Sequence, residues 1–382
     1  MGKQRDKIDF NRPFLTGNEI PYIKEAVSKL QLSGNGFFTK KCHQFFENKL
    51  GVKKCLLTTS CTDALEMAAL LLNIQEGDEV IMPSYTFVST ANAFMLRGAT
   101  IKFVDSREDH PGMNEDEIEK LITVNTKAIV IVHYAGVAAN LDLILELAKQ
   151  YRLAVVEDAA HCIDAYYKGK PLGSFGDLAT FSFHETKNIS CGEGGLLVIN
   201  NPTFMERAEV IWEKGTNRNA FFRGEVDKYG WVDIGSSFLP SELNAAFLFA
   251  QLENLRKIQD KRIAIWSRYY DGLKGLLNLG TVKLPVIPGF ATNNGHLFYL
   301  VLEDEIARNK LLEYLKSVLI NAVFHYQSLH GSSFFKDKHD GRNLPNADRY
   351  TSGLIRLPFY YELSAEDQER VIKEIITYFE VK

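Results

Sequence analysis

The stretch Leu178-Ala-Thr-Phe-Ser-Phe-His-Glu-Thr-Lys187-Asn-Ile-Ser-Cys-Gly-Glu-Gly-Gly195-Leu-Leu-Val-Ile199 places a lysine between two apolar segments. The segments 178–183 and 196–199 predict buried strands, and a glycine-rich turn separates Lys187 from the second. A buried ammonium group is unfavourable unless it is paired or neutralised. A single loop lysine usually reaches water, but a lysine in this position can also form a Schiff base with a carbonyl compound.

The sequence around this stretch alternates between strand-like and helix-like segments. The short apolar runs predict strands at 55–59, 79–82, 101–105, 128–133, 153–157, 178–183 and 196–199. Amphipathic segments predict helices at 62–72, 86–96, 115–122 and 142–151. This alternation is typical of an α/β protein with a mostly parallel central sheet and helices on both faces. Ligands of such sheets bind beyond the carboxyl ends of the strands.

After residue 240 the pattern changes to long helices, predicted at 241–257 and 262–276. They are followed by strand-like 297–302, helix-like 308–319, strand-like 322–326 and a terminal helix from Ser364. The polar segment 331–348 predicts a mobile loop. We therefore expect two domains, a large one over residues 12–250 and a smaller C-terminal α+β domain over residues 251–382.

Composition excludes several classes of function. The 382 residues carry a net charge of −4, so the chain has no basic excess for nucleic acid or anionic lipid. It has no apolar run of membrane-spanning length, and its polar N-terminus lacks an apolar signal core. The five cysteines form no Cys-x-x-Cys pair. We therefore expect a cytoplasmic protein without a disulfide framework or a metal site.

Two further candidate sites, one a segment of four residues and the other a single aspartate, follow predicted strands, as Lys187 does. Ser60-Cys61-Thr62-Asp63 opens a predicted helix, and hydroxyl and free N–H groups there can bind a phosphate or simply cap the helix. Asp158 ends the strand at 153–157. A carboxylate there can keep a heteroaromatic nitrogen protonated, as pyridoxal phosphate (PLP) requires, or can cap the next turn. Glu157 is expected to point to the opposite face of the sheet.

Two other side chains fit the same pattern. The Ser182 hydroxyl lies five residues before Lys187 and is either a second phosphate contact or a satisfied strand end. Phe87 can stack on a flat ring or pack in the core. Each signal is weak alone. Together these residues predict a phosphate-binding helix N-terminus, an aromatic ring that stacks on a ligand, a carboxylate that pairs with a pyridinium, and a lysine, all at one edge of one sheet.

Four motifs make a family resemblance specific. They are Pro83-Ser-Tyr-Thr-Phe-Val-Ser-Thr-Ala-Asn92, Val156-Glu-Asp-Ala-Ala160, Phe181-Ser-Phe-His-x-Thr-Lys-Asn188 and Gly192-Glu-Gly-Gly195. The chain resembles the DegT family of sugar aminotransferases from Phe14 to the final helix. The resemblance implies the PLP-dependent fold type I, which is the fold of aspartate aminotransferase.

The resemblance also implies a role for each matching residue. Lys187 would form the Schiff base with PLP, Asp158 would pair with the pyridine nitrogen, and Phe87 would stack on the ring. His161 would lie near the phenolic oxygen. The phosphate would be held by Ser60, Cys61, Thr62, Asp63 and Ser182.

The resemblance further implies a homodimer with shared active sites. Many members contact the phosphate through an asparagine of the partner subunit within Gly-x-Asn-(Tyr/Phe). Here the matching stretch is Gly235-Ser-Ser237-Phe, so the shorter Ser237 stands in that place.

Within the family, five stretches are most similar to the branch that aminates dTDP-4-keto-6-deoxy-D-glucose for surface polysaccharide. They are Ser60-Cys-Thr-x-x-Leu-Glu-Met-Ala-Ala-Leu-Leu-Leu72, His133-Tyr-Ala-Gly-Val137, Glu213-Lys-Gly-Thr-Asn-Arg218, Phe221-Phe-Arg-Gly224 and Asp233-Ile-Gly-Ser-Ser237. The branch uses L-glutamate and makes dTDP-4-amino-4,6-dideoxy-D-galactose and 2-oxoglutarate. The candidate substrate residues are Lys214, Arg218, Arg223, His325, Tyr326 and His330.

Other functions fit the sequence less well. Within the family, amination at position 3 or with the opposite configuration at position 4 stays open. The sugar dehydratase branch typically has a histidine where this chain has Lys187. A non-catalytic binding or regulatory homologue would have little need for the Lys187–Asp158 pair. A nicotinamide-binding motif at Gly34-Asn-Gly36 lacks both the third glycine and a preceding strand.

Overall fold

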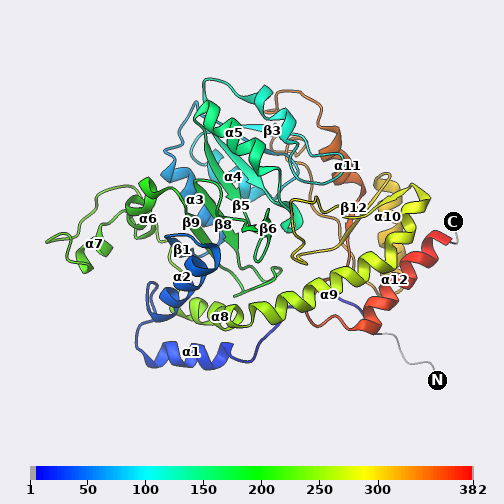
Figure 1. Cartoon of the computed structure of the whole chain (residues 1–382), viewed down its shortest axis with the longest axis horizontal. Coiled ribbons are helices and arrows are strands. Elements are labelled where there is room, and N and C mark those ends of the chain that lie inside the picture. The colour runs from blue at the N-terminus through cyan, green and yellow to red at the C-terminus, as the bar shows by residue number, and fades with distance from the viewer. Residues whose placement is uncertain (1–5, 381–382) are drawn as a thin grey trace.

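The computed structural model describes residues 6–380, so the first residues of the polar N-terminus lie outside the described part of the chain. A seven-stranded sheet forms the centre of the molecule (Figure 1). Its strands are β1 (Cys55–Thr58), β2 (Glu79–Pro83), β3 (Thr100–Val104), β4 (Thr126–Val132), β5 (Ala154–Asp158), β8 (Leu178–Ser182) and β9 (Gly195–Ile199). All seven strand predictions are confirmed to within two residues at each end.

The strand order β1-β9-β8-β5-β4-β2-β3 makes the sheet mostly parallel. β9 is the exception, because it pairs antiparallel with both β8 and β1. The turn that carries Lys187 joins β8 to β9 directly, without a crossover helix, and such a short connection permits only antiparallel pairing. Lys187 is thereby held at the carboxyl end of β8, beside the end of β5.

Helices cover both faces of the sheet, as predicted. Alternate strand residues such as Leu57 and Ile131 pack on one face with α1, α2, α5 and α8, while Leu56 and Val130 pack on the other with α3, α4 and α6. The helix bounds in this part are α1 (Glu19–Ser28), α2 (Phe37–Leu50), α3 (Cys61–Leu71), α4 (Val88–Met95), α5 (Leu141–Tyr151), α6 (Met205–Trp212), α7 (Arg218–Phe222) and α8 (Glu242–Glu253).

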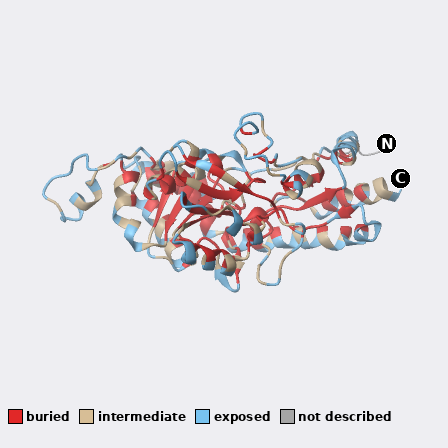
Figure 2. Cartoon of the chain, turned by 90° about the horizontal axis from the view of Figure 1, so that it is seen from above, coloured by how far each residue is buried: buried red, intermediate tan, exposed pale blue. Residues whose placement is uncertain are grey.

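The C-terminal part surrounds a core of its own. The long helix α9 runs from the base of the sheet into the C-terminal part (Figure 1). Residues including Tyr269, Phe298 and Ile372 form the core of this part. The elements are α9 (Leu255–Leu273), β10 (Val282–Lys283), β11 (Tyr299–Leu302), α10 (Glu305–Ser317), α11 (Pro345–Gly353), β12 (Leu354–Arg356) and α12 (Ala365–Glu380). Figure 2 shows buried residues along the central sheet and again in this C-terminal part.

Short elements complete the chain. A two-stranded ribbon pairs β6 (Tyr166–Tyr167) with β7 (Lys170–Pro171). The 3₁₀ turns are η1 (Glu115–Glu117), η2 (Glu119–Leu121), η3 (Tyr134–Gly136), η4 (Pro202–Phe204) and η5 (Lys274–Leu279). Within residues 6–380, no helix is both long and apolar enough to cross a membrane. All five cysteines are free thiols.

Two local predictions are wrong, and the loop predicted at 331–348 is packed against the sheet and leads into α11 at Pro345. The helix predicted at 115–122 is only the two turns η1 and η2, because Glu115 is buried and bonds Arg107 and the backbone N–H of Asn140 instead of lying on a helix surface. The strand predicted at 322–326 makes one bridge, between Val323 and Arg356, before the chain turns toward the sheet. The segment 331–348 packs onto β3, where Phe335 contacts Phe103 with ring centroids 4.8 Å apart.

Candidate active site

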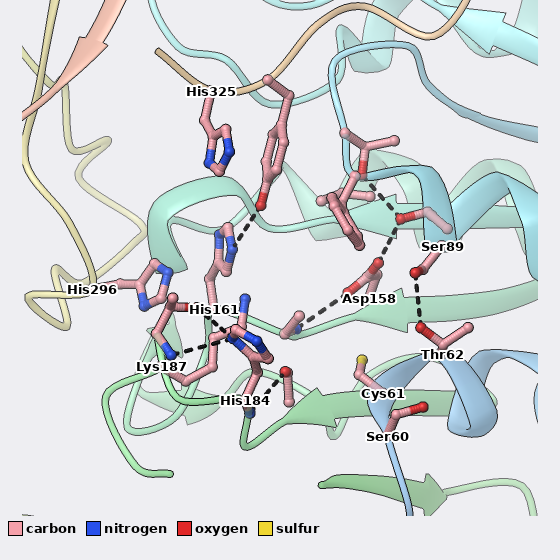
Figure 3. A pocket seen from close by; sticks show the side chains of 18 of the residues that line it. Ser60, Cys61, Thr62, Ser89, Asp158, His161, His184, Lys187, His296 and His325 are labelled. Carbon is pink, nitrogen blue, oxygen red and sulfur yellow. Dashed lines mark hydrogen bonds between the residues drawn. The ribbon is translucent and has the colours of Figure 1, made fainter. Parts of the chain in front are cut away.

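A cavity of about 380 Å³ lies at the carboxyl ends of β5 and β8, next to the N-terminus of α3 (Figure 3). The large sheet contributes one side of the cavity, and Phe10 with segments of the C-terminal part contributes the other. The residues predicted for cofactor binding that line it are Ser60, Cys61, Thr62, Phe87, Asp158, His161, Ser182 and Lys187. Asp63 and Ser237 do not line it. The sequence therefore located the cavity from residues spread over more than a hundred positions.

Lys187 projects into this cavity from the β8–β9 turn (Figure 3). The pKa of its ammonium group is lowered to about 8, mainly by burial; Cys61 and Asp158 oppose the shift, and the positive charge of Arg356 contributes to it. At pH 7 about a tenth of such amines is neutral, compared with fewer than about one in a thousand for an ordinary lysine. The cavity therefore supplies an amine able to act as a nucleophile or a base.

Asp158 is a buried carboxylate at the end of β5. Its Oδ2 accepts a hydrogen bond from Thr90 Oγ1 at 2.8 Å, and its Oδ1 accepts one from the Ala160 N–H at 3.2 Å. Burial nevertheless raises the pKa of this carboxyl group above its usual value. A cationic group in the cavity would restore the charged form of Asp158, as a protonated ring nitrogen would.

Glu157 points to the other face of the sheet, as predicted. It accepts hydrogen bonds from the N–H groups of Gly173, Phe175 and Gly176 and contacts His133 at 3.2 Å. Adjacent carboxylates of one strand thus have separate tasks. Glu157 holds the loop after β7, and Asp158 faces the cavity.

The N-terminus of α3 forms another wall of the cavity. Ser60 Oγ accepts from the Asp63 N–H at 3.0 Å as an N-cap, and Asp63 accepts from the hydroxyls of Thr59 and Ser60. Within residues 6–380, the N–H groups of Cys61 and Thr62 have no backbone partner. These two N–H groups and the positive end of the helix form an anion site, while Asp63 holds the turn from behind.

Gly195 lets β9 approach this turn. A Cβ atom at position 195 would lie 2.3 Å from the carbonyl carbon of Ser60 and 2.5 Å from the nitrogen of Cys61. Only glycine fits so close to another backbone. The glycine-rich turn therefore serves the anion site as well as the placement of Lys187.

Aromatic and imidazole rings enclose the rest of the cavity. Phe87 precedes α4 and its ring is 5.8 Å from that of Tyr326. His161 Nδ1 accepts from the Ala135 N–H, while its Nε2 faces the Tyr326 hydroxyl at 3.4 Å. Burial, then the charge of Lys187, holds the pKa of His161 well below its usual value. The imidazole is therefore neutral, with its proton on Nε2.

The predicted substrate residues divide into two groups. His325 and Tyr326 line the cavity. His330 does not, because its Nδ1 bonds the buried Ser84 hydroxyl at 2.7 Å and its Nε2 faces Asp348. Lys214, Arg218 and Arg223 lie on or near α7, in a segment that projects from the body (Figure 1), and none lines the cavity of its own chain. Ser237 belongs to the base of this segment, bridged to Glu213.

Several cavity residues were not predicted. His296 stacks on His161 with ring centroids 4.0 Å apart, and its Nδ1 donates to Asn188 Oδ1 at 2.7 Å. Arg356 enters from β12, and Thr90 enters from α4 to reach Asp158. Among these unpredicted residues only Thr90 stands in a motif that the sequence analysis quoted, Pro83–Asn92, and no role was assigned to it there.

A cavity that joins an amine of lowered pKa, a buried carboxylate and a helix N-terminus, at the strand ends of this sheet, defines a PLP-dependent enzyme of the aminotransferase class. The chain belongs to the DegT/DnrJ/EryC1/StrS aminotransferase family, whose model matches residues 14–376. It is therefore a PLP-dependent sugar aminotransferase, and the predicted fold class is confirmed.

Solved structures agree with this assignment over nearly the whole chain. DesV of S. venezuelae is 28% identical with a TM-score of 0.89, and the match covers 98% of this chain and 99% of DesV. Helicobacter pylori PseC, an aminotransferase of pseudoaminic acid biosynthesis, is 26% identical with a TM-score of 0.87, covering 99% and 100%. Spr1654 of Streptococcus pneumoniae, solved in a PMP form, is 25% identical with a TM-score of 0.89, covering 96% and 98%.

The residues of the cavity fit PLP. The anion site at Cys61 and Thr62 suits its phosphate, Asp158 suits a protonated ring nitrogen, and Lys187 suits its aldehyde. When bound, PLP supplies an electron sink for the transfer of an amino group.

Proposed function

We propose that the protein transfers the amino group of L-glutamate to C4 of dTDP-4-keto-6-deoxy-D-glucose. The products are dTDP-4-amino-4,6-dideoxy-D-galactose and 2-oxoglutarate. The observation that best supports aminotransferase chemistry is that Lys187 and Asp158 line the same cavity. Support for the substrate comes from the five sequence stretches that resemble this branch of the family, from Ser60 to Ser237.

In this proposal each cavity residue has one task. Lys187 would hold the aldehyde end of the cofactor, and its neutral amine would act as the base that takes up the proton from the donor's Cα. Its lowered pKa supports that role. Asp158 would keep the ring nitrogen protonated, Phe87 would stack on the ring, and His161 would lie near the phenolic oxygen.

The phosphate is assigned to the N–H groups and hydroxyls of Ser60, Cys61, Thr62 and Ser182, with Asp63 holding the turn. We assign Ser237 to the same phosphate across the interface of a homodimer. Its position outside the cavity of its own chain is what such a role requires. The exposed side chains of Phe222 and Trp231 on the projecting segment suit burial against a second subunit. We also retain residues 12–250 and 251–382 as the two domains.

A panel of ketosugars tests the substrate. The purified enzyme, loaded with PLP and given L-glutamate, is offered dTDP- and UDP-linked 3-keto and 4-keto sugars, and the products are identified by NMR. We expect one 4-amino product with the galactose configuration from the dTDP-4-keto sugar. A 3-amino or glucose-configured product would replace the proposed substrate with another one of the family.

A non-catalytic homologue is the alternative from another class. It predicts that L-glutamate leaves the absorption spectrum of the PLP-loaded protein unchanged. A spectral shift on adding L-glutamate alone, before any sugar is present, would exclude it.

A further inference from the structure

Two buried threonine hydroxyls stand behind Asp158. Thr86 comes just before α4 and Thr90 lies in its first turn, and the two residues are 2% and 0% exposed. Thr90 Oγ1 donates to Asp158 Oδ2 at 2.8 Å, and Thr86 Oγ1 lies 3.0 Å from Thr90 Oγ1. The three groups therefore form a chain of hydrogen bonds that ends on the carboxylate.

This arrangement is not the one that a helical threonine usually adopts. A threonine in a helix can satisfy its hydroxyl locally, on a backbone carbonyl three or four residues earlier. Thr90 instead bonds the side chain of Asp158, which lies 68 residues further along the chain at the end of β5. The Thr90 hydroxyl thus serves the cavity carboxylate rather than its own helix.

The direction of the chain follows from the number of protons available. An ionised carboxylate only accepts hydrogen bonds, and a threonine hydroxyl has one proton to donate. Thr90 therefore donates to Asp158 and accepts the hydrogen bond of Thr86. Hydrogen bonds to a charged acceptor are about twice as strong as neutral ones, and neighbouring bonds strengthen each other. The chain thus stabilises the ionised form of Asp158.

Asp158 needs this stabilisation because it is buried. Burial raises the pKa of its carboxyl group, and the Thr90 hydrogen bond is the largest influence in the opposite direction. The Ala160 N–H, which donates to Oδ1, acts in the same direction as Thr90, as do Lys187 and His133. Each carboxylate oxygen then has one protein donor, and the lone pairs that remain can accept a further donor from the cavity.

We propose that Thr90 and Thr86 are positioning residues, which hold Asp158 ionised and oriented toward the ring nitrogen of the cofactor. This inference rests on the proposed function, because it concerns the carboxylate that is assigned there to the ring nitrogen. A protonated ring nitrogen lets PLP act as an electron sink. Loss of the Thr90 hydroxyl should therefore slow the chemistry without weakening the binding of the amino-acid donor.

Thr90→Val tests the inference, because valine has nearly the shape of threonine without its hydroxyl. In the cofactor-free protein, ¹³C NMR follows the titration of the Asp158 carboxyl carbon, whose signal is assigned with Asp158→Asn. We expect the midpoint to rise by about 1 pH unit, as for loss of one hydrogen bond to a charged group. In the enzyme loaded with ring-¹⁵N PLP, the nitrogen resonance should move toward that of an unprotonated ring.

Stopped-flow absorbance of the L-glutamate half-reaction separates binding from chemistry. For Thr90→Val we expect the maximal rate to fall roughly 10-fold, and the apparent Kd for L-glutamate to change by less than about threefold. Thr86→Val should change each quantity in the same direction and by less, and it supplies the same test should Thr90→Val not fold. Thr90→Ser keeps the hydroxyl and should resemble the wild type.

Thr126→Val is the matched control. Thr126 is a buried threonine at the amino end of β4, away from the cavity, and its Oγ1 accepts from the Thr123 N–H at 2.9 Å. Its replacement should leave the Asp158 titration, the nitrogen resonance and the half-reaction unchanged.

An unchanged Asp158 titration or nitrogen resonance in Thr90→Val would overturn the inference. So would a Thr90→Ser variant that behaves like Thr90→Val, or a Thr126→Val variant that reproduces the same changes. Failure of the wild type with every ketosugar would reject the proposed substrate alone, because none of these measurements uses the sugar.

Discussion

At the scale of single residues, the site keeps ionisable groups in unfavourable surroundings. Burial lowers the pKa of Lys187 to about 8 and raises that of Asp158. Both shifts reduce the stability of the cofactor-free fold, since a shifted pKa is also a difference in folding free energy. The folded protein is therefore less stable without the cofactor, because its cavity suits a cationic ring and a neutral amine.

Replacing Lys187 by methionine should stabilise the cofactor-free protein. The shift from about 10.4 in the unfolded chain to about 8 corresponds to at most about 3 kcal/mol, and water in the cavity reduces it, so we expect about 1–3 kcal/mol at pH 7. The destabilisation by Lys187 is fully present below pH 8. It fades as the pH rises toward about 10.4, because the unfolded chain then loses the same proton. Urea unfolding of both proteins at pH 7 and about pH 10 measures the difference.

A control keeps this comparison specific. Lys149→Met changes an exposed lysine of α5 and should give no pH-dependent difference from the wild type. A stability difference for Lys187→Met that is absent at pH 7, or equal at both pH values, would contradict the lowered pKa.

Sequence reasoning found the cavity residues that directly follow strands. Ser60, Asp158 and Lys187 each come within five residues of a strand end, and strand ends of one sheet meet in space. Arg356 and His296 could not be found in this way. They reach the cavity through the packing of the C-terminal part, which no local pattern encodes.

At the scale of elements, one buried carboxylate fixes the start of α2. Glu242, at the beginning of α8, accepts hydrogen bonds from the N–H groups of Gly36, Phe38 and Thr39 at 3.0, 2.7 and 3.1 Å. It also bonds the Thr39 hydroxyl. These N–H groups at the start of α2 have no partner within the helix, so Glu242 caps α2 from another part of the chain.

Glu242→Ala should lower the free energy of unfolding by about 3 kcal/mol, because it leaves several buried donors without an acceptor. Glu242→Gln should have a smaller effect, since one amide oxygen remains. Denaturant melts of the PLP-free protein measure both. Glu366→Ala, in the exposed first turn of α12, is the control and should change stability by less than about 0.5 kcal/mol. Equal effects of Glu242→Ala and Glu366→Ala would contradict the cap.

The element predictions succeeded where a periodic pattern matched its surroundings. All seven strands of the sheet alternate or run apolar between turn residues, and tertiary packing agrees with that pattern. The helix predicted at 115–122 failed because Glu115 turns inward to a long-range partner. The strand predicted at 322–326 failed because an apolar run can also cross the surface of a core without pairing.

At the scale of the whole molecule, the proposed sharing of active sites between two subunits makes a quantitative prediction. In the proposed dimer, Lys187 and Ser237 of one site come from different subunits. Lys187→Ala removes the amine that holds the cofactor, and Ser237→Asp places a negative charge near the phosphate and repels it. In a symmetric dimer formed from both variants at random, half of the dimers are mixed, and each mixed dimer has one intact site. Co-expression should therefore restore about a quarter of wild-type transamination in the unfractionated mixture, and about half in the mixed dimers isolated through two affinity tags.

The matched control pairs Lys187→Ala with Asp158→Asn. Both residues line the cavity of one chain, so every site of their mixed dimers is damaged and no activity should return. Recovery in this control, or none in the first mixture, would contradict a site completed by Ser237 of a second subunit.

Chemical trapping of the cofactor shows directly which lysine carries it. The PLP-loaded protein is reduced with borohydride, digested and mapped by mass spectrometry. We expect a pyridoxyl group on Lys187 in nearly all molecules, and none on the exposed Lys149. Label on a different lysine, or no stable label at all, would contradict the assignment of Lys187 as the residue that carries the chemistry.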